Sequence, residues 1–136
     1  MLISSEDQKA IEARLHAYLA AFEKGDAEAY AEQFTFPACI WDGVNWIAIP
    51  DRETCLKKCQ SWVQEAREAG AARGATLDMR IIPLLSKAAI NQLSYQRVGP
   101  DGRATENIRA AYLMLKLDDG WKIATVVGES EPATLD

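Results

Sequence analysis

The sequence predicts an α+β fold in which three helices of the N-terminal half pack against a strongly curved antiparallel or mixed sheet, giving a cone-shaped roll. Two observations lead to this prediction. Residues 17–34, AYLAAFEKGDAEAYAEQF, have the pattern of two helices with a junction between them, and β-rich segments follow one another from residue 75 onward. Because helical segments come first and strands later, we expect the helices to cover one side of a single sheet.

A long helix is expected to begin near Ser5, because Ser5 and Gln8 have the spacing of a capping box. Gly25 is expected to end this helix in the left-handed conformation, and Asp26 to cap a short second helix that stops before Pro37. The apolar stripe of the long helix consists of residues at helical spacing: Ile11, Leu15, Tyr18 and Phe22.

Strand-forming residues follow at 38–49, ACIWDGVNWIAI, and a third helix is expected after Pro50, with Asp51 as its cap, running to about residue 70. This helix carries an apolar face on one side. The order of helix, helix, strands and helix places all three helices in the first half of the chain.

Four strands are expected in the second half, and turn residues indicate how they connect. VGPDGR at 98–103 and the pair Asp119-Gly120 are typical of tight turns between antiparallel strands. Pro83 lacks an amide donor, so its strand is expected to be bent, bulged or at the sheet edge. The four segments are 75–85, 88–98, 105–117 and 120–127. We expect one domain over residues 1–128 and a polar tail over 129–136.

Composition excludes several classes of function. The chain has 136 residues, a hydrophobic fraction of 49% and a formal net charge of −5, which fits one globular domain and opposes binding to nucleic acid. No apolar run approaches the roughly 18 residues of a membrane span, so no membrane partner is expected. The first ten residues lack the pattern of a secretory signal, and three is an odd number of cysteines. We therefore expect a cytoplasmic protein with reduced thiols.

Together, residues 17–34, the strand led by Pro37 and residues 110–123, AAYLMLKLDDGWKI, resemble the nuclear-transport-factor-2-like superfamily. Its members include ketosteroid isomerases, polyketide-cyclase-like enzymes and many proteins of uncharacterised function. The resemblance covers nearly the whole chain. A cone of this kind keeps a cavity at its wide end that is large enough for a small ligand.

Within that superfamily, ketosteroid isomerases carry a tyrosine on the first helix and an aspartate at the end of the first strand, and Tyr18 and Asp42 stand in these places. In that enzyme the aspartate moves a proton next to a carbonyl, while the tyrosine and a protonated carboxylic acid hold the enolate oxygen. The resemblance implies the same roles for Tyr18 and Asp42. The second acid has no counterpart in residues 108–117, where the matching register falls on Ala111 or Leu113.

Each of these two residues also has a structural interpretation. Asp42 precedes Gly43, so it is alternatively the first residue of a hairpin turn whose side chain binds local amides. Tyr18 lies on the apolar stripe and is alternatively a core tyrosine with a satisfied hydroxyl group.

Candidate ligand-binding residues come mainly from the strand at 105–117. Arg109 shares strand parity with Asn107, Ala111 and Leu113, a series expected to face inward, where a cation needs an ion-pair partner or an anionic ligand. Asn107 would then lie nearer the mouth, and Tyr95 would line the same space from the neighbouring strand.

The tryptophans and cysteines complete the candidate residues. Trp41, Trp46 and Trp62 form either an aromatic wall for a flat ligand or part of the core. Cys55 and Cys59 lie one helical turn apart, but no third ligand accompanies them, so no metal site is expected.

Two functional hypotheses follow. The first is a cofactor-independent isomerase, dehydratase or cyclase that acts by proton transfer on an apolar carbonyl or acid compound, and the second is a ligand-binding or scaffold module without catalysis. A third possibility is a pure interaction domain in which the cone is filled and the outer face of the sheet is the working surface. Tyr112, Met114 and Trp121 are expected on the outer face of the sheet, where they favour a homodimer.

Overall fold

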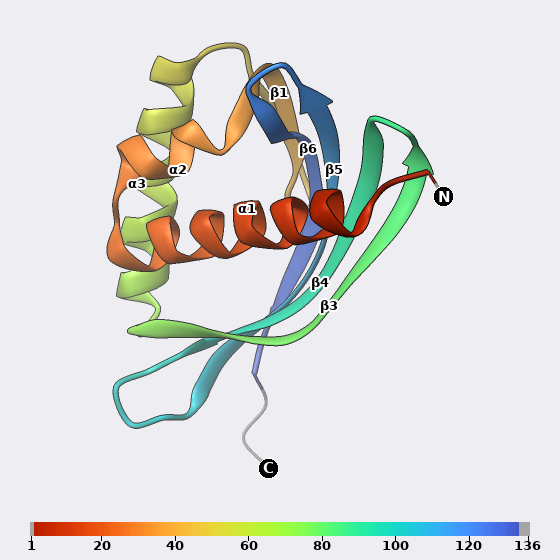
Figure 1. Cartoon of the computed structure of the whole chain (residues 1–136). Coiled ribbons are helices and arrows are strands. Elements are labelled where there is room, and N and C mark those ends of the chain that lie inside the picture. The colour runs from red at the N-terminus through yellow and green to blue at the C-terminus, as the bar shows by residue number, and fades with distance from the viewer. Residues whose placement is uncertain (1, 134–136) are drawn as a thin grey trace.

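The order of helices and strands in the computed structural model, which describes residues 2–133, agrees with the order expected from the sequence (Figure 1). Three helices lie on the concave side of one curved sheet, so the α+β prediction is confirmed. The helices are α1 (Ser5–Lys24), α2 (Ala27–Glu32) and α3 (Arg52–Glu68). The strands are β1 (Phe34–Trp41), β2 (Trp46–Ile49), β3 (Arg73–Leu85), β4 (Ala88–Val98), β5 (Ala104–Leu117) and β6 (Gly120–Pro132). Over the described residues, no helix is long and apolar enough to cross a membrane.

The sheet is mixed, with the strand order β2-β1-β6-β5-β4-β3. Strands β1 and β6 run parallel, and every other neighbouring pair is antiparallel. Pro83 lies in the edge strand β3, and the register against β4 shifts between Pro83 and Leu85, as its missing amide donor led us to expect. Strand β6 continues to Pro132, which pairs with Glu106, so residues 129–132 of the expected tail belong to the sheet. Residues 134–136 of that tail lie outside the described residues.

The ends of the first two helices follow from local capping. The Ser4 hydroxyl accepts the Asp7 amide at 3.0 Å, and the Asp7 carboxylate accepts the Ser4 amide at 3.1 Å. The capping box therefore lies one residue earlier than expected, because the carboxylate of Asp7 is a stronger acceptor than the amide of Gln8 and its charge suits a helix N-terminus. Gly25 ends α1 with φ of 73°, as predicted.

The start of the first strand differs from the expectation. Helix α2 ends at Glu32 and β1 begins at Phe34, so Pro37 lies inside the strand and does not end the helix. Pro37 is tolerated there because the register between β1 and β6 is irregular between Phe34 and Cys39.

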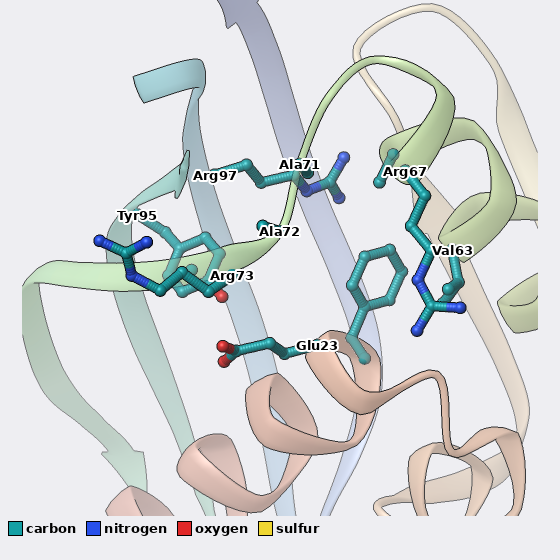
Figure 2. A pocket seen from close by; sticks show the side chains of 11 residues that line it. Glu23, Val63, Arg67, Ala71, Ala72, Arg73, Tyr95 and Arg97 are labelled. Atoms are coloured by element: carbon teal, nitrogen blue, oxygen red, sulfur yellow. The ribbon is translucent and has the colours of Figure 1, made fainter. Parts of the chain in front are cut away.

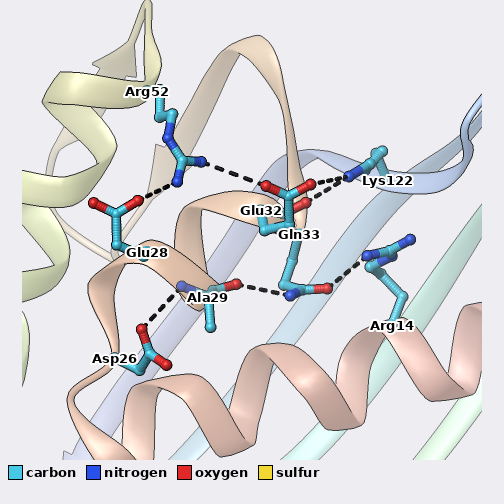
Figure 3. A network of polar contacts seen from close by, with 8 residues as sticks. All are labelled: Arg14, Asp26, Glu28, Ala29, Glu32, Gln33, Arg52 and Lys122. Atoms are coloured by element: carbon cyan, nitrogen blue, oxygen red, sulfur yellow. Dashed lines mark hydrogen bonds and ion pairs between the residues drawn. The ribbon is translucent and has the colours of Figure 1, made fainter.

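Ion pairs and hydrogen bonds hold α2 between α3 and the sheet (Figure 3). Arg52 of α3 forms ion pairs with Glu28 and, at 3.5 Å, with Glu32. Lys122 of β6 donates to the Glu32 carbonyl at 2.6 Å. Arg14 of α1 donates to the Gln33 side chain at 2.8 Å. Side chains from three other elements therefore fix this short helix, which could not be stable alone.

The core lies between α1, α3 and the concave face of the sheet. Ile11 and Leu15 of α1 and Met114 and Ile123 of the sheet have no exposed surface. The predicted outer-face position of Tyr112, Met114 and Trp121 is therefore wrong, because all three are buried in this core. In residues 110–115 both the odd and the even positions are apolar, so hydrophobicity alone did not show which set of side chains points inward. A shift of one residue in the strand exchanges the inward and the outward set.

Candidate functional site

A cavity of about 670 Å³ opens between the helices and the concave face of the sheet, and we call it the cone. It is lined by side chains of α1, α2, α3, β1, β4, β5 and β6 and of two connecting segments. Its volume lies within the range of small-molecule binding sites. Apolar and aromatic side chains form much of the lining, and three groups of polar side chains in it bear on its chemistry.

The first polar place is a cluster of three tyrosines. The ring of Tyr18 on α1 lies 5.0 Å from that of Tyr30 and 5.2 Å from that of Tyr112, measured between centroids. Tyr30 and Tyr112 are buried, whereas Tyr18 keeps part of its surface accessible. Burial raises the pKa of Tyr18, and hydrogen bonds with Tyr30 and Tyr112 oppose that rise.

Tyr18 differs from its two neighbours in its exposure. Burial raises the pKa of Tyr30 and of Tyr112 well above the ordinary value, and the nearby Tyr18 raises both further. A phenolic hydroxyl that stays protonated can donate one hydrogen bond. Of the three tyrosines in the cone lining, Tyr18 keeps part of its surface accessible, so its hydroxyl is the one available to a ligand oxygen.

The second polar place is Asp42, in the turn between β1 and β2. Asp42 lines the cone but is exposed, and its Oδ1 accepts the amides of Asn45 at 2.7 Å and Val44 at 2.9 Å. These bonds, that from Asn45 first, lower the pKa of Asp42. Asp42 therefore combines the two roles that the sequence left open, as a turn residue and as a group at the cavity.

The third polar place is an ion pair that the sequence reasoning missed. Arg97 of β4 donates to Glu106 of β5 at 2.9 Å, and both side chains line the cone and are about three-quarters buried. The Arg97 guanidinium also lies 4.8 Å from the centroid of the Phe22 ring, which is a cation–π contact. Opposite charges on the two strands that flank the turn at 98–103 could have indicated this pair, although a register shift next to Arg97 offsets it from the turn.

Sequence comparison agrees with this architecture. The profile of a family described as "NTF2-like protein (DUF6841)" matches residues 6–131, which is nearly the whole chain. The chain belongs to this NTF2-like family. None of the curated proteins matches the sequence.

Solved structures show the same fold for this NTF2-like chain. A cystatin-like-fold protein of unknown function from Nostoc punctiforme aligns with a TM-score of 0.81 and 13% identity, over 98% of this chain and 97% of that one. A ketosteroid isomerase-like protein from Erwinia carotovora has a TM-score of 0.74 and 17% identity, over 96% and 100%. A candidate dehydratase of the NTF2-like family from Streptomyces avermitilis has a TM-score of 0.70 and 14% identity, over 93% and 96%. At these identities the likeness concerns the fold.

The predicted inward position of Arg109 in this NTF2-like chain is wrong. Arg109 is exposed, and its cross-strand partners are Ser94 of β4 and Glu129 of β6. Arg109 and Asn107 have the opposite parity to Tyr112, which faces the helices. The Asn107 side chain accepts a hydrogen bond from Gln96 at 3.0 Å, also outside the cone. Both residues lie outside the cone because β5 turns toward the helices the set of side chains that was expected on its outer face.

The remaining candidates divide between the cone and the outer face. Trp62 and Tyr95 line the cone, as expected. Trp41 and Trp46 are exposed, with ring centroids 6.4 Å apart, so they form neither core nor a wall of the cone. The homodimer through the outer face stays a prediction, and its apolar residues would now be these tryptophans and Val127, which pairs with Trp41 and is exposed.

The two neighbouring cysteines of α3 belong to the core. Cys55 and Cys59 are almost completely buried, and burial raises their pKa values to about 11 and about 12. Within residues 2–133, no three His, Cys, Asp or Glu side chains converge in a way that could hold a metal ion. These thiols therefore act as small apolar side chains.

Proposed function

We propose that this protein binds a small, mainly apolar molecule with a carbonyl group in the cone and transfers a proton at the carbon next to that carbonyl. The proton leaves this carbon for the Asp42 carboxylate, and the electron pair of the C–H bond moves to the carbonyl oxygen. The Tyr18 hydroxyl donates to the enolate oxygen that forms. Where a carbon–carbon double bond follows that carbon, the enolate is a dienolate, and return of the proton to its far end makes the reaction an isomerisation. Where the next carbon bears a hydroxyl group, the enolate expels it, and the proton held by Asp42 converts it to water, which makes the reaction a dehydration.

The observation that carries this proposal is the position of Tyr18, which lines the cone, keeps accessible surface and packs against the buried rings of Tyr30 and Tyr112. In the proposed arrangement these two neighbours donate to the Tyr18 oxygen, so the Tyr18 proton is left for a ligand and the donor is held in place before the ligand arrives. Preorganised donors of this kind stabilise charge that develops on an oxygen. The names of two structural relatives, a ketosteroid isomerase-like protein and a candidate dehydratase, indicate the same class of chemistry.

Asp42 is the proposed proton carrier because it lines the cone and because its turn contacts use Oδ1, which leaves Oδ2 for the proton. Its lowered pKa keeps it ionised near neutral pH but makes it a weak base. Glu106 also lines the cone, and its ion pair with Arg97 makes it the less available carboxylate.

Proton exchange of 2-tetralone tests the proposal, because this flat, apolar ketone has exchangeable protons beside its carbonyl. The wild-type protein in D₂O should accelerate their loss from the proton NMR spectrum, and Tyr18→Phe should slow it by about 100-fold. Asp42→Asn should abolish it, whereas Glu106→Gln should retain it, and Arg109→Gln on the outer face is the matched control. No acceleration by the wild type, or full activity of Tyr18→Phe, would overturn the proposal.

A second candidate function is binding without catalysis, and it is favoured by the engagement of Asp42 in its turn and by the lowered pKa that results. The yellow anion of 4-nitrophenol resembles an enolate and reports its own ionisation by absorbance. Tyr18-dependent binding of this anion without exchange of 2-tetralone would identify a binding module. Binding together with exchange would identify an enzyme.

A further inference from the structure

A second, smaller cavity of about 30 Å³ adjoins the cone (Figure 2). The two cavities share four lining residues, among them Phe22, Tyr95 and Arg97. Two further arginines line the small cavity, Arg67 from the end of α3 and Arg73 from the start of β3. We call it the arginine chamber, after Arg67, Arg73 and Arg97.

The charges around the arginine chamber are unusual for this acidic chain. Arg67, Arg73 and Arg97 line it, and Glu23 is the carboxylate in the same lining. Glu106, the ion-pair partner of Arg97, and Glu65 line the adjoining cone. Arg67 and Arg73 are exposed and, within residues 2–133, form no ion pair. Arginines therefore outnumber carboxylates in the lining of the chamber itself, in a protein with a net charge of −5.

Arg97 supplies the buried donor of the chamber. Its Nη1 donates to Glu106, but its Nε is buried and has no hydrogen-bond partner among the described residues. A buried guanidinium N–H without an acceptor is costly, so an acceptor that enters from the cavity would be strongly favoured. The Phe22 ring packs against this guanidinium and helps to hold it in place.

Tyr95 adds a neutral donor at the same place. Its hydroxyl lies directly over Gly74 of β3, where a Cβ atom would come within 1.5 Å of it. A glycine at position 74 is therefore what allows this hydroxyl to reach the chamber. Burial raises the pKa of Tyr95 to about 12, so the hydroxyl stays protonated and can donate.

The lining of the chamber indicates the kind of anion. The chamber is small, about 30 Å³, and is lined by three arginines. A carboxylate has two oxygens, and arginine side chains match its planar geometry.

We propose that the arginine chamber binds the carboxylate of the molecule whose carbonyl enters the cone, so that the ligand is an apolar keto acid. The inference rests on the proposed function for the carbonyl end and on the chamber alone for the acid end. Phe22 and Tyr95 line both cavities and would contact the apolar part between the two groups. The anion anchor expected from the sequence at Arg109 is thereby replaced by Arg97 and its neighbours.

Binding of 2-naphthoate, compared with its neutral analogue 2-naphthamide, tests the chamber by isothermal titration calorimetry. The two probes have the same ring system and differ in charge. The wild-type protein should bind the acid at least about tenfold more tightly than the amide. Arg73→Gln should remove most of this preference while leaving the affinity for the amide unchanged. Arg109→Gln, on the outer face, is the matched control and should leave the preference intact.

Arg97→Gln would leave Glu106 without its partner, so the double variant Arg97→Gln/Glu106→Gln removes both charges together. It should lose the preference for the acid and keep its fold by circular dichroism. Equal affinity of the wild type for the two probes would overturn the inference, as would a preference that survives both Arg73→Gln and the double variant. A preference lost only in Arg109→Gln would overturn it too.

The two proposals fail in different experiments. An acid preference that depends on Arg73 and Arg97, in a protein that neither exchanges 2-tetralone nor binds 4-nitrophenolate through Tyr18, would uphold the chamber and overturn the proposed function. Exchange that depends on Tyr18, without any preference for 2-naphthoate, would uphold the proposed function and overturn the chamber.

Discussion

Removal of the Tyr18 hydroxyl by Tyr18→Phe should destabilise the fold more than removal of either neighbouring hydroxyl. In the proposed arrangement Tyr18 accepts hydrogen bonds from Tyr30 and Tyr112, both buried, so its loss leaves two buried donors without an acceptor. Tyr112→Phe removes one donor and leaves Tyr18 with the bond from Tyr30. The rings keep their packing in both variants, because phenylalanine has the same shape up to the missing oxygen.

The expected losses of unfolding free energy follow from the number of buried donors that each change leaves without an acceptor. A buried donor without a partner costs about 1–3 kcal/mol, so two of them give an upper range of about 2–6 kcal/mol for Tyr18→Phe. Tyr18 borders the cone, where water can accept one of the freed protons, and this places the expected loss at about 2–3 kcal/mol. Tyr112→Phe, which only deletes a hydrogen bond, should cost about 1 kcal/mol.

Urea unfolding followed by circular dichroism measures both losses on the same scale, provided that the dependence on urea concentration is unchanged. The result that refutes the reasoning is a loss in Tyr18→Phe no larger than that in Tyr112→Phe. Tyr18 would then not be the shared acceptor, and the proposed donation from its hydroxyl to a ligand oxygen would lose its structural basis.

Three further changes test other parts of the structure. Gly74→Ala places a Cβ 1.5 Å from the Tyr95 hydroxyl oxygen and 2.1 Å from the Tyr95 Cζ. It should therefore lower the free energy of unfolding, measured in urea, by about 1–3 kcal/mol. In a Tyr95→Ala background the same change should cost nothing, because the clashing ring is gone. Hydrogen bonds with Lys116, then with the Trp121 indole and the Ser4 amide, lower the pKa of Asp7. Asp7 therefore stabilises the fold above its unfolded pKa of about 4, and Asp7→Asn should flatten the loss of thermal stability as the pH falls below about 5. Asn91 has no exposed surface and its amide has no partner among the described residues, so Asn91→Leu should raise stability by about 1–2 kcal/mol.

One result would contradict each of these three predictions. If Gly74→Ala remains equally costly in the Tyr95→Ala background, the strain does not come from the tyrosine. If thermal stability falls as steeply at low pH in Asp7→Asn as in the wild type, Asp7 does not contribute to that fall. A loss of stability in Asn91→Leu would mean that the buried amide is satisfied by a bound water.

The helices and turns could be predicted from the sequence because their signals are local. The Asp51 carboxylate caps α3 by accepting the Thr54 amide at 2.8 Å, and Gly25 ends α1, each within a few residues of the pattern that predicted it. Asp119-Gly120 and the turn at 98–103 connect antiparallel strands as expected. Helical spacing also placed Tyr18 on the inward stripe of α1 without reference to any other element, whereas its candidate role came from the resemblance to ketosteroid isomerases.

The facing of β5 could not be predicted, because it depends on register between strands. Both parities of residues 110–115 are apolar, and the register against β6 shifts between Leu113 and Met114. Local alternation therefore carried no information about which face meets the helices. The same uncertainty placed Arg109 inside and hid the pairing of Arg97 with Glu106, which requires the register across a hairpin.

The corrected register changes the chemistry that the cone can support. Ketosteroid isomerase holds its enolate with a tyrosine and a protonated carboxylic acid. Here the carboxylate on the cone side of β5 is Glu106, and it accepts a hydrogen bond from Arg97 in an ion pair. In the proposed mechanism Tyr18 is then the one donor assigned to the enolate oxygen. With one donor in place of two, and a weakly basic Asp42, the arrangement favours substrates whose proton is already acidic, such as one placed between a carbonyl and a second activating group.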